Sequence, residues 1–254
     1  MHIARVALRV SDLDRSIDWY GRVAGLALRE RADDHASLGA PDGGPVRLEL
    51  RRAERPGGPP RHAAGLFHTA FRYPTRAALG AALQRIVTGG ESFTGASDHA
   101  VSEALYLDDP EGIGVELYRD RPRDEWPPPP PGSKVFMTTE PLDADGVLAA
   151  AEGGLPDAAN GVDVGHVHLK VADVEQAVEF WTREVGMEVM ARYGADAAFI
   201  ADGGYHHHIG ANSWYSRGAE LEPRDGPGID RVVLANAQPR QLVTPDGVEI
   251  AVES

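Results

Sequence analysis

The sequence predicts an α+β protein built from four βαβββ modules, the fourth of them truncated. Three observations support this prediction. A stretch near the start of the chain repeats in its second half, two further stretches follow the same plan, and each copy opens with alternating apolar and polar residues. Such alternation is typical of a strand that buries one face.

The first and third modules are the clearest copies. Residues Arg5–Leu28, RVALRVSDLDRSIDWYGRVAGLAL, align without a gap with residues His166–Val189, HVHLKVADVEQAVEFWTREVGMEV. In both copies the alternating strand runs into Asp12 or Asp173, and aspartate is a favoured N-cap. Apolar residues then recur at helical spacing until a glycine ends the helix. The shared pattern indicates one structural unit used twice.

The second and fourth modules are less complete. Residues Gly65–Tyr73, GLFHTAFRY, form an alternating strand, Thr75–Val87 are predicted to be helical, and Glu103–Tyr118 are predicted to form two strands around the turn DPEG. In the last module, from Gly228, IDRVVLANA runs almost directly into VTPDGVEIAVE. This leaves no room for a helix.

The modules predict two domains, residues 1–119 and 163–254, joined by a connection at 120–162. The connection contains Trp126 and five prolines, Pro127–Pro131, which predict a stiff, extended spacer. A short helix is predicted at Asp143–Glu152.

Composition excludes several classes of function. The net charge of −14 makes nucleic acid and anionic membrane surfaces poor partners. Without cysteine, any metal site must use His, Asp or Glu. No apolar run approaches the roughly 18 residues of a membrane span, and the N-terminus is too charged for a signal peptide. We therefore expect a cytoplasmic protein with small-molecule partners, and a homo-oligomer is compatible with this sequence.

Two stretches carry a resemblance to a known family. They are GASDHAVSEALYLDDPEGIGVELY at Gly95–Tyr118 and GYHHHIGANSW at Gly204–Trp214. Together with the modules and the H-x-x-L-x-V opening at His166, they resemble the vicinal-oxygen-chelate superfamily of glyoxalases, antibiotic-sequestering proteins and extradiol dioxygenases. Within it, the chain looks most like the two-domain catechol 2,3-dioxygenases.

The faces of the predicted strands agree with this resemblance. Alternation places His166, His168 and Lys170 on one face of their strand, opposite apolar residues. His68 and Arg72 share a second polar face, and Glu116 and Tyr118 a third. Solvent exposure would account for such faces in an antiparallel sheet. The resemblance instead implies two half-barrel cups, with helices outside and the polar faces inside.

The resemblance also implies a ligand set. The family places metal ligands at the His of a module's first strand and at the Glu four residues after the turn glycine. Here these positions hold His68 and Glu116 in the second module and His166 in the third, whereas the first and fourth modules hold Arg5, Arg231 and Ala251. We therefore expect modules two and three to share a cup and bind one metal through His68, Glu116 and His166. The competing site would place Glu249 or Glu253 beside His166 and His207.

Two histidines and one carboxylate are the ligands of non-haem iron(II) oxygenases. They leave three positions on an octahedral ion, enough for a catecholate and dioxygen. Fe(II) is thus the expected cofactor, and Mn(II) or another divalent metal is compatible with the same ligands.

Further residues receive roles from the resemblance. His207 corresponds to the acid/base, His99 to a residue that hydrogen-bonds the substrate or its oxygen adduct, and Tyr106 and Tyr118 are candidates inside the cup. A solvated polar strand or an adventitious metal binder is the alternative for the triplet His206–His208. The triplet is predicted to lie on a strand near Gly204, so alternation turns His206 and His208 away from His207, unless a bulge intervenes. Lys170 and Arg72 could attract an anionic substrate.

The leading hypothesis is therefore extradiol cleavage of a catechol-type aromatic with O2. A glyoxalase-like lyase or isomerase is the second hypothesis, but it usually needs a fourth protein ligand. A non-catalytic, antibiotic-binding protein is the third, and such proteins typically lack the ligand set.

Overall fold

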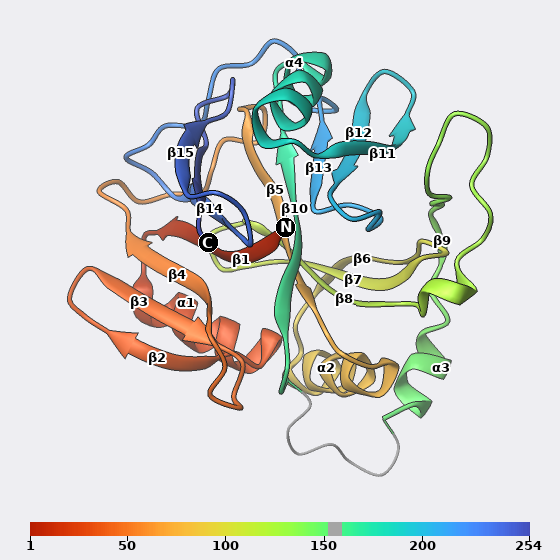
Figure 1. Cartoon of the computed structure of the whole chain (residues 1–254). Coiled ribbons are helices and arrows are strands. Elements are labelled where there is room, and N and C mark those ends of the chain that lie inside the picture. Colours follow the sequence, from red (N-terminus) through yellow and green to blue (C-terminus); the bar gives the residue numbers. More distant parts are fainter. Residues whose placement is uncertain (152–158) are drawn as a thin grey trace.

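The computed structural model describes residues 1–151 and 159–254, which form two curved sheets with helices on their outer surfaces (Figure 1). The two sheets meet along their central strands, where β1 lies against β10 and β14 against β5. Apolar side chains from both sheets and from the helices form one continuous core.

The larger sheet has nine strands in the described residues, in the order β11-β12-β13-β10-β5-β8-β7-β6-β9. Their bounds are β11 Glu188–Tyr193, β12 Ala197–Ala201, β13 Ile209–Asn212, β10 Asp163–Lys170, β5 Gly65–Arg72, β8 Gly114–Asp120, β7 Ser102–Asp108, β6 Phe93–Asp98 and β9 Glu140–Pro141. This sheet combines modules two and three, as predicted.

The smaller sheet combines modules one and four. Its order in the described residues is β15-β16-β14-β1-β4-β3-β2. The bounds are β15 Arg240–Val243, β16 Glu249–Val252, β14 Gly228–Ala235, β1 His2–Val10, β4 Val46–Arg52, β3 His35–Gly39 and β2 Ala27–Arg31. The fourth module passes from β14 to β15 and β16 without a helix, which confirms its truncation.

The helices begin where the sequence places capping residues. Asp12, Thr75 and Asp173 accept backbone N–H groups at the starts of α1, α2 and α4. Left-handed glycines, Gly25 at φ 71° and Gly186 at φ 88°, end the two repeated helices. The helical segments are α1 Leu13–Trp19 with the π-helical turn η1 Tyr20–Ala24, α2 Arg76–Gly89, the 3-10 turn η2 Arg123–Glu125, α3 Ala144–Ala149, and α4 Val174–Glu179 with the π-helical turn η3 Phe180–Val185.

The burial of the polar strand faces distinguishes between the two interpretations, a solvent-exposed surface and the inside of a cup. His166 and Glu116 are each 2% exposed and His68 is 6% exposed, so this polar face is not a solvated surface. The opposite face of the same strands, with Val167 and Phe71, lies in the apolar core. The polar face is therefore the inside of a cup, which confirms the predicted fold class.

The connection between the halves packs along the larger sheet. Its strand β9 pairs with β6, and the backbone N–H groups of Lys134 and Val135 donate to the carbonyl of Met190. The predicted helix appears as α3, with Asp143 as its cap, and the predicted end at Glu152 lies outside the described residues. Both sheets take strands from each side of the connection, and the division into domains 1–119 and 163–254 stays a prediction.

No helix among the described residues has the length and apolar character needed to cross a membrane.

Candidate metal centre

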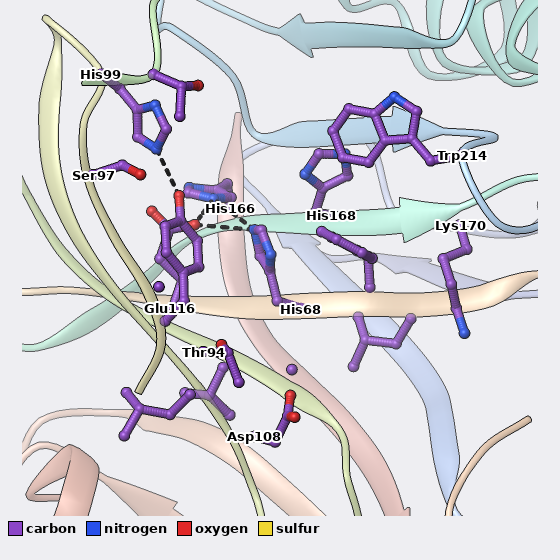
Figure 2. A pocket seen from close by; sticks show the side chains of 18 of the residues that line it. His68, Thr94, Ser97, His99, Asp108, Glu116, His166, His168, Lys170 and Trp214 are labelled. Atoms are coloured by element: carbon purple, nitrogen blue, oxygen red, sulfur yellow. Dashed lines mark hydrogen bonds and ion pairs between the residues drawn. The ribbon is translucent and has the colours of Figure 1, made fainter. Parts of the chain in front are cut away.

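Three buried side chains converge inside the larger cup (Figure 2). Nε2 of His68 lies 3.3 Å from Nε2 of His166, and Oε2 of Glu116 lies 3.0 Å from the first nitrogen and 2.9 Å from the second. Residues from three strands and two modules thus present three donor atoms to one point.

Strand register brings these donors together. Ala70 of β5 lies opposite His166 on the antiparallel strand β10 and beside Glu116 on the parallel strand β8. His68 precedes Ala70 by two residues and therefore points to the same face. Because the buried Ala70 has only a methyl group, it leaves space above it for the three larger side chains.

The charges of this cluster suit a cation. Among the described residues, only the two histidines lie within ion-pairing distance of the Glu116 carboxylate. Burial opposes ionisation of Glu116, but His166 and His68 outweigh it and hold the carboxyl pKa well below its usual range. Burial lowers the pKa of His166 to about 4, so this imidazole is neutral near pH 7. A buried carboxylate beside the neutral His166 imidazole requires a positive charge, and two nitrogens with one oxygen suit a divalent transition metal.

The equivalent positions in the smaller cup hold two arginines and a glutamate in place of the two histidines and the glutamate. Ala7 of β1 lies opposite Arg231 and beside Glu49, as Ala70 does with His166 and Glu116. Arg5, two residues before Ala7, donates to Glu49 across 2.7 Å. Guanidinium groups therefore occupy the two positions that hold histidines in the larger cup. Sequence reasoning missed Glu49, although this acid alternates with the apolar residues of VRLEL and so lies on the polar face of its strand.

The competing site is wrong. Glu249 pairs with Arg231, and Glu253 pairs with Arg5, both in the smaller sheet. Neither carboxylate belongs to the sheet that contains His166.

A cavity of about 1130 Å³ opens above the three donors. Its walls are rich in aromatic and histidine side chains: Phe67, Tyr106, Tyr193, Phe199, Trp214, Tyr215, His99, His168 and His207. This volume exceeds the upper end of the roughly 300–1,000 Å³ common for ligand pockets.

His99 and Tyr106 form a pair in this cavity. Nδ1 of His99 lies 2.6 Å from the carbonyl oxygen of Thr138, and Nε2 lies 2.6 Å from the Tyr106 hydroxyl. The carbonyl only accepts, so Nδ1 carries the proton and Nε2 of a neutral His99 accepts from Tyr106. Burial and the nearby Glu116 carboxylate raise the pKa of Tyr106 well above 10, which keeps the hydroxyl protonated.

His207 lies over the metal cluster. Its ring centroid is 4.1 Å from that of His166, and the side chain is buried. Burial, followed by the neighbouring histidines, lowers the pKa of His207 well below 6.5, so the ring is neutral near pH 7. His207 thus lies beside the three donors without belonging to their cluster.

The prediction that His206 and His208 face away from His207 is wrong for His206. Nδ1 of His206 lies 2.8 Å from Nδ1 of His207, and its Nε2 lies 2.8 Å from Oδ1 of Asp120. Residues 202–208 form a turn and β13 begins only at Ile209, so strand alternation does not apply. With His206 donating to Asp120, its Nδ1 accepts from His207, and Nε2 of His207 retains its lone pair.

Of the remaining candidates, Lys170 lines the cavity, whereas His208, Tyr118 and Arg72 do not. His208 accepts from the backbone N–H of Asp202 and packs on the ring of Tyr205. Tyr118 is fully buried, with its hydroxyl 2.7 Å from that of Tyr205. Arg72 pairs with Asp163 and Asp120 and does not line the cavity, so it is not available to attract a substrate.

Comparison with known proteins agrees with this architecture. Residues 2–117 match the family model described as the Glyoxalase/Bleomycin resistance protein/Dioxygenase superfamily. A Bacillus subtilis (strain 168) protein named Catechol-2,3-dioxygenase is 40% identical over 252 residues, which cover 95% of this chain and 86% of the relative. The chain belongs to this superfamily.

Solved structures of other superfamily proteins share the fold. A dioxygenase candidate from Bacillus subtilis subsp. subtilis str. 168 aligns over 99% of this chain and 85% of its own, with a TM-score of 0.64 and 14% identity. Glyoxalase I from Zea mays aligns over 99% and 91%, with a TM-score of 0.56 and 16% identity. At such identities these structures show the fold alone.

Sequence reasoning assigned no role to two residues of the cavity wall, His168 and Trp214. Their ring centroids lie 5.8 Å apart, and His168 lies directly opposite His68 across β10 and β5. Strand alternation already placed His168 on the face of His166, and this signal could have identified it. Trp214 follows β13 in a loop, where no periodicity predicts the direction of a side chain.

Proposed function

We propose that this protein is an extradiol dioxygenase that cleaves the ring of a catechol-type aromatic with O2 at one mononuclear iron(II) site. The observation that carries the proposal is the cluster of His68, Glu116 and His166, three buried donors with no cationic side chain among the described residues to neutralise the carboxylate. The similarity to a protein named Catechol-2,3-dioxygenase over nearly the whole chain supports the same reaction.

His68, Glu116 and His166 would hold the metal. When bound, iron(II) would supply a Lewis acid and a redox centre with three positions free of protein ligands. Manganese(II) is compatible with the same donors, whereas zinc would lack the redox chemistry.

The protein's own groups would handle the protons. A catechol hydroxyl placed at the cluster would lie beside His207, whose Nε2 would take its proton and return it to an oxygen of the substrate later in the reaction. Asp120 holds His206, and His206 in turn fixes the orientation of His207. Tyr106, whose proton is directed to His99, would offer an oxygen lone pair to a hydroxyl of the substrate, and the buried walls would keep bulk water away.

The ligand set argues against the two alternatives. A glyoxalase-like lyase would usually add a fourth protein ligand, and the compact donor cluster in the described residues consists of these three. A binding protein of the antibiotic-sequestering kind would have no need for the complete set.

Metal analysis combined with oxygen uptake tests the proposal. Protein loaded anaerobically with iron(II) should consume one O2 for each catechol and give a muconic semialdehyde, in which both oxygen atoms are retained. Isomerisation of a hemithioacetal without oxygen uptake would favour the lyase. Binding of the aromatic with neither reaction would favour the binding protein.

A further inference from the structure

The inner face of β10 carries three polar residues in succession. His166, His168 and Lys170 alternate with apolar residues, and all three line the same cavity. At about 3.3 Å per residue, the Cα atom of Lys170 lies roughly 13 Å along the strand from that of His166. A ligand lying along β10 from the metal cluster would meet an imidazole and then an ammonium group (Figure 2).

Lys170 forms no ion pair with an acid among the described residues. Its side chain is 6% exposed, and Nζ donates to the carbonyl of Pro60 across 3.2 Å, with the carbonyl of Arg61 at 3.5 Å. Within residues 1–151 and 159–254, no carboxylate lies within 4.0 Å of Nζ. The carboxyl group of Glu222 lies further away and favours the charged form of Lys170. It accepts a hydrogen bond from the backbone N–H of Ile229.

Arg61 adds a second positive charge at this end. Its guanidinium lies 5.2 Å from the ring centroid of Tyr215, and it too has no ion-pair partner among the described residues. The nearly buried ammonium of Lys170 forms no ion pair among the described residues, and a buried charge without such a partner is unfavourable. The guanidinium of Arg61 is exposed and lines the same cavity, so an anionic group of a ligand there would be attracted by both charges.

The wall between the metal cluster and Lys170 suits an aromatic molecule with a side chain. The His168 ring lies 5.2 Å from Phe67 and 5.8 Å from Trp214. Its buried Nε2 has no hydrogen-bond partner among the described residues. Gly210 makes room for this ring, since a Cβ there would meet His168 Cγ at 2.7 Å. The unpartnered nitrogen is a second feature, besides the charges, that a ligand would satisfy.

We propose that the substrate is a catechol with an anionic substituent, a carboxylate on a short chain, which Lys170 and Arg61 bind while the hydroxyls lie at the metal cluster. This inference rests on the proposed function for the position of the hydroxyls. A single ring would leave most of the roughly 1130 Å³ cavity unfilled, whereas a substituent directed along β10 would extend toward Lys170.

A matched pair of ligands tests the inference: 3-(2,3-dihydroxyphenyl)propanoate and its primary amide, which differ in charge and hardly in shape. Binding to the iron(II)-loaded protein is measured by calorimetry without oxygen, so turnover does not enter. We expect the acid to bind at least roughly tenfold more tightly than the amide, as for a hydrogen bond to a charged group. Lys170→Met should remove most of this preference, and Lys170→Arg should retain it.

Two further variants guard against indirect effects. Lys170→Met could disturb the loop at Pro60 and Arg61, to which Lys170 donates. Arg61→Gln changes an exposed side chain instead, and it should also weaken binding of the acid. Asp108→Asn removes a charge of opposite sign from the same cavity, and the preference for the acid should not fall. Equal affinities of acid and amide for the wild type, or a full preference in the Lys170→Met, Arg61→Gln double variant, would overturn the inference. Absent oxygen uptake with every catechol would overturn the proposed function instead.

Discussion

Arg231 occupies in the smaller sheet the position that His166 occupies in the larger one. Each lies directly opposite a buried alanine on the neighbouring antiparallel strand, Ala7 for Arg231 and Ala70 for His166. The two cups therefore share one backbone plan, and the side chains at equivalent positions decide which of them can bind a metal. This equivalence provides an internal control for the metal site.

His166→Ala should lower the metal content far below one ion per chain, and Arg231→Ala should leave it unchanged. His166→Ala removes one of the three donors. Arg231→Ala removes a cation from the smaller cup, which lacks the donor set. Metal is measured by elemental analysis after gel filtration, with circular dichroism to verify the fold. Stoichiometric metal in the His166→Ala protein would refute the assignment, as would loss of metal in Arg231→Ala.

His207→Ala should keep its metal and lose roughly 10²–10⁴-fold in the rate of ring cleavage, the usual contribution of a positioned acid/base. His206→Ala should give a smaller loss, because His206 orients His207 through the 2.8 Å contact between their Nδ1 atoms. His208→Ala, whose ring packs on Tyr205 instead, should be the mildest of the three. Metal content and oxygen uptake are measured for all three. Metal loss in His207→Ala would make this residue a ligand.

Tyr106→Phe should slow turnover by about 2–10-fold, the effect of losing one hydrogen bond of about 0.5–1.5 kcal/mol. The variant keeps the ring and removes only the hydroxyl that lies 2.6 Å from His99. Tyr193→Phe is the matched control, since Tyr193 also lines the cavity but donates to the carbonyl of Met137. Steady-state oxygen uptake is the measurement. Equal rates for Tyr106→Phe and the wild type would remove Tyr106 from the reaction.

Glu222→Gln should flatten the dependence of stability on pH. Burial raises the pKa of Glu222 to about 7, despite the backbone N–H of Ile229 and the nearby Arg9. A carboxyl with a raised folded-state pKa stabilises the protein below its unfolded-state value of about 4.3, and this contribution is lost as the pH rises through about 7. The loss is on the order of 2–4 kcal/mol, at 1.36 kcal/mol per pKa unit.

Urea unfolding at pH 5 and pH 8 measures this effect. The wild type should lose more free energy of unfolding between these two values than Glu222→Gln does. Glu220→Gln, which changes an exposed carboxylate two residues earlier, should behave as the wild type. Parallel profiles for the wild type and Glu222→Gln would show that Glu222 ionises at its ordinary pKa.

Local periodicity predicted much of this structure. The repeat at Arg5 and His166, the capping aspartates and the missing fourth helix correspond to the elements observed. Alternation also placed His68, Glu116 and His166 on polar faces of their strands. These features depend on neighbouring residues along the chain, and the geometry of a strand or helix converts such patterns directly into faces.

Contacts between distant segments decided the rest. Which strands pair is a long-range choice, and only the register of β5 with β10 and β8 brings His68, His166 and Glu116 around Ala70. His206 was misplaced because residues 202–208 turn instead of forming a strand, so tertiary contacts with Asp120 and His207 set its direction. Sequence alone thus determined the modules and the candidate donors. The three-dimensional packing decided which donors meet, since a donor's partners come from strands far away in the chain.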